Sequence, residues 1–117
     1  MQQRSLDDTQ LNPIERQALD ELRRRLFQKY DFVEQIVLFG SVARGTATEE
    51  SDIDLLIFTR DPLDNWTRRE ISEVVSDVNL EYETNICTIV LDQWTWTTIY
   101  PVELAIKREV QRDGIVV

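Results

Sequence analysis

The sequence predicts a single mixed α/β domain (α+β), in which a small twisted β-sheet carries helices packed mainly on one face. Three observations predict this class: an apolar stripe at helical spacing within 14–30, strand-like runs at 33–39, 54–59 and 84–91, and a second helical stripe between the last two runs. A chain of 117 residues can bury one core of ordinary size. We expect a flexible tail at 1–11, which is polar and aperiodic, and one domain at 12–117.

The first helix has a clear start signal. Asn12 can cap it, Pro13 suits the first helical position, and Glu15 can close a capping box. The run 33–39 then predicts a strand, and 41–45 predicts one or two helical turns. The apolar stripe of the first helix consists of Ile14, Ala18, Leu19, Leu22, Leu26 and Tyr30.

The second half of the chain repeats the alternation of strand and helix. The run 54–59 predicts the second strand and 84–91 the third, while the segment 94–100 favours neither type. Pro101 starts or kinks a last helix, Gly114 ends it, and 115–117 adds a short strand. The helix between the second and third strands buries Ile71, Val74, Val75 and Val78. The predicted inner face of the last helix is Val102, Ala105, Ile106 and Val110.

Composition excludes several kinds of site. The formal net charge of −9 argues against a broad nucleic-acid surface, which needs clustered basic residues. The absence of histidine excludes histidine acid–base catalysis and histidine-containing zinc sites, and the single Cys87 excludes a four-thiolate zinc site and an internal disulfide. No apolar run approaches the roughly 20 residues that span a bilayer, and the N-terminus lacks the features of a secretory signal. We therefore expect a soluble, cytoplasmic protein without membrane contact.

The junction after the first strand carries a candidate phosphate-binding turn. Gly40 and Gly45 would let the backbone approach a phosphate closely, and the hydroxyl and N–H of Ser41 could donate to its oxygens. Arg44 would add a charged donor, and the positive end of a short helix favours an anion. Alone, a Gly-Ser turn is more often an ordinary loop. The ligand that fits it is the triphosphate of ATP or another nucleoside triphosphate.

Two carboxylates follow this turn. Asp52 and Asp54 are two residues apart where a strand begins, so they project from one face, about 7 Å apart along the strand. Their charges would repel each other and a triphosphate unless Mg2+ neutralises them, and two such ions roughly 4 Å apart would suit nucleotidyl transfer. The alternative is that both decorate a strand end in solvent. If each of these five residues, the two aspartates with Gly40, Ser41 and Gly45, occurs at a frequency of about 5 to 7%, their combined spacing would arise by chance about once per million starting positions.

Gly40-Ser41-x-x-x-Gly45 followed by Asp52-x-Asp54 resembles the signature of the minimal nucleotidyltransferase (MNT) domains of the DNA polymerase β superfamily. The resemblance covers most of the chain, although only this motif is specific. It implies the nucleotidyltransferase fold, catalysis and metal binding by Asp52 and Asp54, and triphosphate contact by Gly40, Ser41 and Arg44. Such domains are commonly antitoxins of HEPN toxins and can attach AMP to a toxin tyrosine. The implied function is Mg2+-dependent transfer of AMP from ATP to a protein hydroxyl.

The sequence departs from this family at a third carboxylate, whose expected place on the third strand falls at Cys87. By strand parity Glu83, the nearest acid, shares a face with Asn85 and Cys87. Either Glu83 reaches in, or the catalytic metal is weakly held. We expect Cys87 to be a small buried hydrophobe rather than a nucleophile.

The missing acid leaves a second hypothesis open: a non-catalytic antitoxin or binding module that neutralises a partner protein by direct binding. Transfer to a small molecule is disfavoured, since no acceptor-binding lobe is evident. The base, the acceptor and the oligomeric state, including a homo-oligomer, stay open. The aromatic cluster of Trp94, Trp96 and Tyr100 either packs under the last helix or forms a partner surface. The arginines at 23–25 and 68–69 are interpreted as solvated helix faces.

Overall fold

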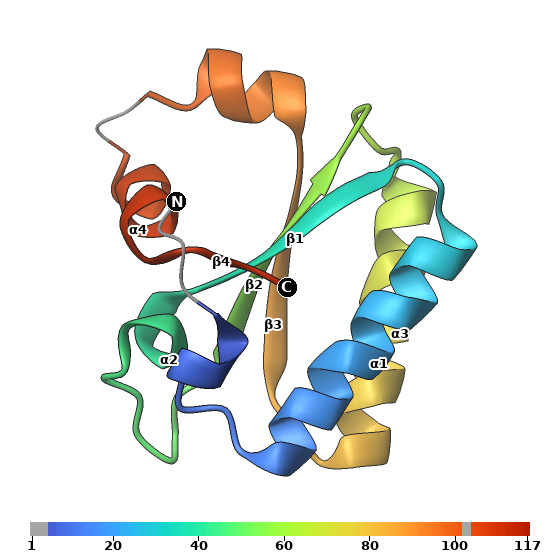
Figure 1. The fold of residues 1–117 in the computed structure, drawn as a ribbon. Helices are drawn as coiled ribbons and strands as arrows, with labels where there is room; N and C mark the ends of the chain where they lie inside the picture. Colours follow the sequence, from blue (N-terminus) through green and yellow to red (C-terminus); the bar gives the residue numbers. More distant parts are fainter. Residues whose placement is uncertain (1–4, 102–103) are drawn as a thin grey trace.

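The computed structural model describes residues 5–101 and 104–117, and it is built around a four-stranded sheet in the order β3-β2-β1-β4 (Figure 1). The sheet has helices on both sides. In chain order the elements are a 3-10 helix at Leu6–Asp8, α1 at Pro13–Lys29, β1 at Val33–Phe39, α2 at Gly40–Arg44, β2 at Ile53–Thr59, α3 at Asn65–Tyr82, β3 at Ile86–Asp92, a π-helix at Thr95–Ile99, α4 at Ala105–Asp113 and β4 at Ile115–Val116.

The sheet is mixed, as predicted. β1 pairs antiparallel with β2 and with β4, whereas β2 pairs parallel with β3 through the crossover helix α3. In this register Phe39 lies opposite Asp54, and Asp54 lies opposite Cys87. The end of β1 and the starts of β2 and β3 therefore meet at one end of the sheet.

The sheet separates two cores of unequal size. Ile53, Leu55 and Ile57 of β2 face the larger core, which α1 and α3 cover side by side (Figure 1). The alternate residues of β2, Leu56 and Phe58, face a smaller core that includes residues from the π-helix and α4. The prediction of helices packed mainly on one face is confirmed, and the smaller core covers only part of the opposite face.

The first helix begins as its sequence predicts. The N–H of Glu15 donates to Oδ1 of Asn12 at 2.8 Å, and the N–H of Asn12 donates to Oε1 of Glu15 at 3.0 Å. Ile14 was expected in the apolar stripe but is 56% exposed, because the buried face of α1 begins a turn later at Ala18.

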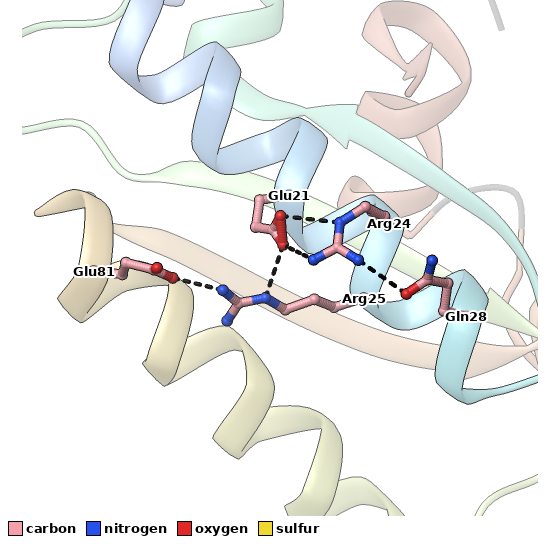
Figure 2. A network of polar contacts seen from close by, with 5 residues as sticks. All are labelled: Glu21, Arg24, Arg25, Gln28 and Glu81. Atoms are coloured by element: carbon pink, nitrogen blue, oxygen red, sulfur yellow. Dashed lines mark hydrogen bonds and ion pairs between the residues drawn. The ribbon is translucent and has the colours of Figure 1, made fainter.

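An ion-pair network joins the outer surfaces of α1 and α3 (Figure 2). Nε of Arg25 donates to Glu21 at 2.9 Å, and Nη2 of the same guanidinium donates to Glu81 of α3 at 2.5 Å. Arg24 also pairs with Glu21 and donates to Gln28 at 2.9 Å. Solvent screening weakens ion pairs at the surface, so these contacts only supplement the apolar packing beneath them.

Side chains of α3 cover the free edge of β3. The Asn79 amide donates to the Ile86 carbonyl at 3.0 Å and accepts from the Ile86 N–H at 2.8 Å. Nη1 of Arg68 donates to the Val90 carbonyl at 3.0 Å, so the interpretation of Arg68 as part of a solvated face is wrong. These contacts occupy edge groups that could otherwise pair with another strand.

The C-terminal third differs most from expectation. The ambiguous segment forms a π-helix, and the buried Lys107 donates to the carbonyls of Trp96 and Tyr100, both at 2.9 Å. Because Lys107 takes an inward position on α4, Ala105 is exposed, contrary to the prediction, while Val110 is buried as expected. The helix begins at Ala105 rather than at Pro101. Val102, the first residue of the predicted inner face, lies outside the described residues.

The N-terminal segment contains more structure than a tail. Ser5 caps the 3-10 helix through a capping box with Asp8, and both Leu6 and Leu11 pack against the larger core. Packing therefore extends at least to Leu6. Residues 1–4 of the predicted tail lie outside the described part of the chain. Within residues 5–101 and 104–117, no helix is both long and apolar enough to cross a membrane.

Candidate functional site

The two aspartates lie together at the start of β2, on the face of the sheet that carries the smaller core. Ile53, which separates them, is 1% exposed and faces the larger core, so Asp52 and Asp54 project in the opposite direction. Both are half-buried. Parallel pairing of β2 with β3 places Cys87 opposite Asp54, and it places Asn85 beside Asp52. The predicted same-face arrangement of the carboxylates is therefore present.

The predicted phosphate turn contacts one of these carboxylates. A Cβ added to Gly40 would lie 2.3 Å from Oδ2 of Asp54, and Gly40 has a φ of +81°. Glycine is thus needed here both for backbone conformation and for space. Ser41 follows in the first turn of α2, which has no side-chain cap, so its first N–H groups lack an intrahelical or capping partner. The turn therefore lies directly against the carboxylate of Asp54.

Gly45 ends the short helix. Its φ is +85°, and its N–H donates to the Ser41 carbonyl at 3.0 Å. No atom outside its immediate neighbours lies within 4 Å of the place where a Cβ would stand. Its contact with a nucleotide stays a prediction, whereas its structural role is that of a left-handed C-cap.

The electrostatics of the site favour a cation. Burial raises the pKa of Asp54, and the charges of Asp52 and Glu109 raise it further, while Arg44 opposes them. The raised pKa means that burial and the two neighbouring acids disfavour the ionised carboxylate more than Arg44 favours it, and a bound cation would favour the ionised form. The donors are carboxylate oxygens, which Mg2+ prefers, so the residues fit this ion. Among the described residues no cluster of three or more His, Cys, Asp or Glu side chains has a metal-binding arrangement.

Cys87 lies where the third carboxylate was expected, opposite Asp54. It is exposed, so the prediction of a buried position is wrong: the smaller core covers the middle of this face and leaves the end near the aspartates open. Partial desolvation, followed by the negative charge of Asp52, raises the pKa of the thiol. The thiol is therefore protonated near neutral pH, in agreement with a residue that is not a nucleophile.

Glu83 does not take the place of that carboxylate on the strand. It caps the C-terminus of α3 in the left-handed conformation with a φ of 55°, and β3 begins only at Ile86. Strand parity therefore does not extend to Glu83. Asn85 instead donates its side-chain amide to Oδ1 of Asp52. Sequence parity had placed Asn85 on this face, but an amide offered no signal of a role in the site.

Arg44 extends from α2 toward α4. Its Nη1 lies 2.6 Å from Oε1 of Glu109 and 3.7 Å from Oδ2 of Asp113. The turn residue predicted to contact a triphosphate is therefore paired with two acids of α4. No local pattern connects residues 65 positions apart, so sequence reasoning missed Glu109 as a neighbour of the site.

Comparison with known proteins bears on the family and the fold of the domain. Residues 19–117 match the profile of the family described as "Nucleotidyltransferase domain". A curated relative from Methanocaldococcus jannaschii, "Putative protein adenylyltransferase MJ1305", is 41% identical over 80 residues, which make up 66% of this chain and 49% of the relative. The chain thus spans about half the length of that relative.

Solved structures show the same fold. A chain from a crystal structure of a mutant MntA-HpeT toxin–antitoxin pair superposes with a TM-score of 0.57 at 22% identity, over 92% of this chain and 72% of that chain. A second, from tri-AMPylated Shewanella oneidensis HEPN toxin in complex with MNT antitoxin, has a TM-score of 0.54 at 18% identity, over 86% and 69%. With the fold, the motif and the match over residues 19–117 in agreement, the chain belongs to the nucleotidyltransferase domain family.

Proposed function

We propose that this chain transfers a nucleoside monophosphate, AMP from ATP, onto a hydroxyl of a protein in a Mg2+-dependent reaction, as the cytoplasmic antitoxin of a HEPN/MNT pair. The observation that carries the proposal is the contact between Gly40 and Asp54, which joins a phosphate turn to a carboxylate pair. The name of the curated relative supports AMP transfer to protein. The AMPylated HEPN toxin in a structural neighbour supports the partner class.

Each residue of the site has a proposed role. Asp52 and Asp54 would hold the metal, which when bound neutralises charge on the triphosphate and stabilises the departing pyrophosphate. Asn85 orients Asp52 through its amide donor. The N–H groups of the Gly40-Ser41 turn hold the phosphates. The acceptor hydroxyl gives up its proton to solvent as its oxygen forms a bond to the α-phosphorus. The bond from that phosphorus to the oxygen bridging to the β-phosphate breaks, and pyrophosphate leaves with that electron pair.

A second candidate function is favoured by one observation. Cys87 occupies the position opposite Asp54 where a third carboxylate would help to hold the catalytic metal. A chain with this substitution could neutralise a partner by binding alone. Its net charge of −9 would attract a basic partner under either function.

Co-expression with the product of the neighbouring gene separates these functions. We expect intact-mass spectrometry to show a partner heavier by one or more AMP units with the wild-type chain, and an unmodified partner with Asp54→Asn. An unmodified partner in a tight complex with both chains would support the binding module instead. Glu83→Gln is the matched control, because Glu83 lies off the strand and should leave the modification unchanged.

A further inference from the structure

The N-terminal segment 5–12, which we call the strap, reaches the loop that leads to the aspartates (Figure 1). Gln10 of the strap contacts Ala47, 37 positions later, in the loop 46–51 between α2 and β2. The N–H of Ala47 donates to Oε1 of Gln10 at 2.7 Å, and Nε2 of Gln10 donates to the Ala47 carbonyl at 3.5 Å. One side chain therefore holds both backbone polar groups of a loop residue.

The strap is attached to the domain independently of this loop. Leu6 and Leu11 pack against the larger core, and Oγ1 of Thr9 donates to the Leu6 carbonyl at 2.6 Å. Asp7 lies 3.0 Å from Arg16 of α1. The strap can therefore serve as a fixed support for the loop. It precedes residues 19–117, the part of the chain that matches the nucleotidyltransferase domain family.

The loop has little other attachment. Among the described residues, the two contacts of Gln10 are the hydrogen bonds that join 47–51 to the rest of the chain. The others close a turn within the loop, where the Ser51 N–H donates to the Thr48 carbonyl at 3.1 Å and the Thr48 N–H donates to Oγ of Ser51 at 2.9 Å. A cavity of about 480 Å³ lies between the strap, the start of α1 and the loop, so side-chain packing fills this space only in part.

The loop also leads into a concentration of negative charge. Glu49 and Glu50 are followed closely by Asp52 and Asp54, and like charges repel one another. After the loop, the chain is fixed again at Asn85, whose carbonyl accepts from the Ile53 N–H at 3.0 Å and whose amide donates to Asp52. Asp52 therefore lies between two anchors, Gln10 before it and Asn85 beside it.

We propose that Gln10 is a positioning residue for the aspartate pair: by holding Ala47 it fixes the loop, and Asp52 thereby keeps the place in which it and Asp54 can share a cation. The inference rests on the proposed function for the role of that cation. Gln10 acts through the backbone of the loop, because its hydrogen bonds go to the N–H and carbonyl of Ala47. Without them, charge repulsion would move the chain that enters β2 away from Asp54.

Amide hydrogen exchange of the full chain without metal, followed by NMR, tests the attachment. Gln10→Ala should accelerate exchange at Ala47 and at Ile53 about three- to tenfold, the usual effect of losing one hydrogen bond. Gln10→Glu keeps an acceptor for the Ala47 N–H and should restore most of the protection. Asp7→Asn is the matched control, because it removes the ion pair with Arg16 and leaves the Gln10 contact in place.

Three results of the exchange experiment would overturn the proposal. The first is exchange in Gln10→Ala that equals the wild type at both amides. The second is faster exchange at Ala47 alone, since the effect would then stop before Asp52. The third is equal acceleration in Asp7→Asn, which would assign the effect to general loosening of the strap.

Isothermal titration of ATP separates positioning from a general effect on stability. Gln10→Ala should reduce the gain in ATP affinity from Mg2+ several-fold and leave the affinity without Mg2+ unchanged, since the Gly40-Ser41 turn follows β1 directly and lies outside the loop. A gain equal to that of the wild type would overturn the positioning role. If the wild type itself shows no gain, the proposed function fails at its metal, whereas coupled exchange at Ala47 and Ile53 would still support the role of Gln10 in placing Asp52.

Discussion

Replacement of Gly40 by alanine tests the contact on which the site depends. Both Gly40→Ala and Gly45→Ala place a side chain at positive φ, near +81° and +85°, which costs about 1–2 kcal/mol for an L-residue. Only at position 40 does the added Cβ meet another group, Oδ2 of Asp54 at 2.3 Å, whereas position 45 is open. Since an ordinary contact begins near 3.4 Å, the Asp54 carboxylate must move by about 1 Å.

Overpacking of this kind destabilises the folded state by a further amount of about 1–3 kcal/mol. Gly40→Ala should therefore lower the free energy of unfolding by about 2–5 kcal/mol and Gly45→Ala by about 1–2 kcal/mol. Urea denaturation measures both values, and a double-mutant cycle assigns the difference. Asp54→Ala removes the clashing oxygen and leaves a Cβ contact of 3.3 Å, so it should rescue much of the loss at position 40 and none at position 45.

Equal losses for the two glycine variants would refute this reasoning. Additivity of Gly40→Ala with Asp54→Ala would refute it as well, because the clash would then not involve the carboxylate. Either result would separate the phosphate turn from the aspartate pair.

Three further predictions concern the same end of the sheet and its edge. Cys87→Asp supplies a carboxylate opposite Asp54. In a partner-labelling assay it should raise the Mg2+-dependent rate of AMP transfer at least tenfold over both the wild type and the control variant Cys87→Asn. No gain would argue that position 87 is not the place of the third acid. Burial and the charge of Asp52 raise the pKa of Asp54 in the folded state. Between the ordinary and the raised pKa the folded protein therefore binds a proton that the unfolded chain does not. In the absence of metal, the contribution of Asp54 to the free energy of unfolding then falls as pH rises through that window. Urea unfolding from pH 4 to 7 should therefore show Asp54→Asn gaining stability relative to wild type as pH increases, and a constant difference would contradict the assignment. Asn79→Ala removes two hydrogen bonds to Ile86 and should lower the free energy of unfolding by about 1–3 kcal/mol. Asn79→Asp keeps only the acceptor, so it should lower the free energy of unfolding by a smaller amount.

Local signals predicted most of the fold. The capping box at Asn12 and the strand at 33–39 depend on residues that are close in sequence, and both are confirmed. The aspartates at 52 and 54 project together because side chains on a strand alternate regardless of tertiary context. The expectation that the third-acid position falls at Cys87 came from the resemblance to the minimal nucleotidyltransferases, and Cys87 does lie opposite Asp54.

Features that depend on long-range packing could not be predicted in this way. The pairing of Arg44 with Glu109 joins α2 to α4 across 65 residues, and no periodicity reports it. Lys107 reads as a surface residue, yet two carbonyls at the end of the π-helix satisfy its ammonium inside the protein. Once Lys107 faces inward, Ala105 must face outward, which explains the error in the inner face of α4.

We propose that the Gly40-Ser41 turn and the aspartates form one Mg2+–nucleotide site. Its most direct test is isothermal titration of ATP with and without Mg2+, in the wild type and in Asp54→Asn. We predict that Mg2+ tightens ATP binding to the wild type at least tenfold, and that this gain is lost in the variant although the variant remains folded. Equal ATP affinity in all four titrations would contradict the claim.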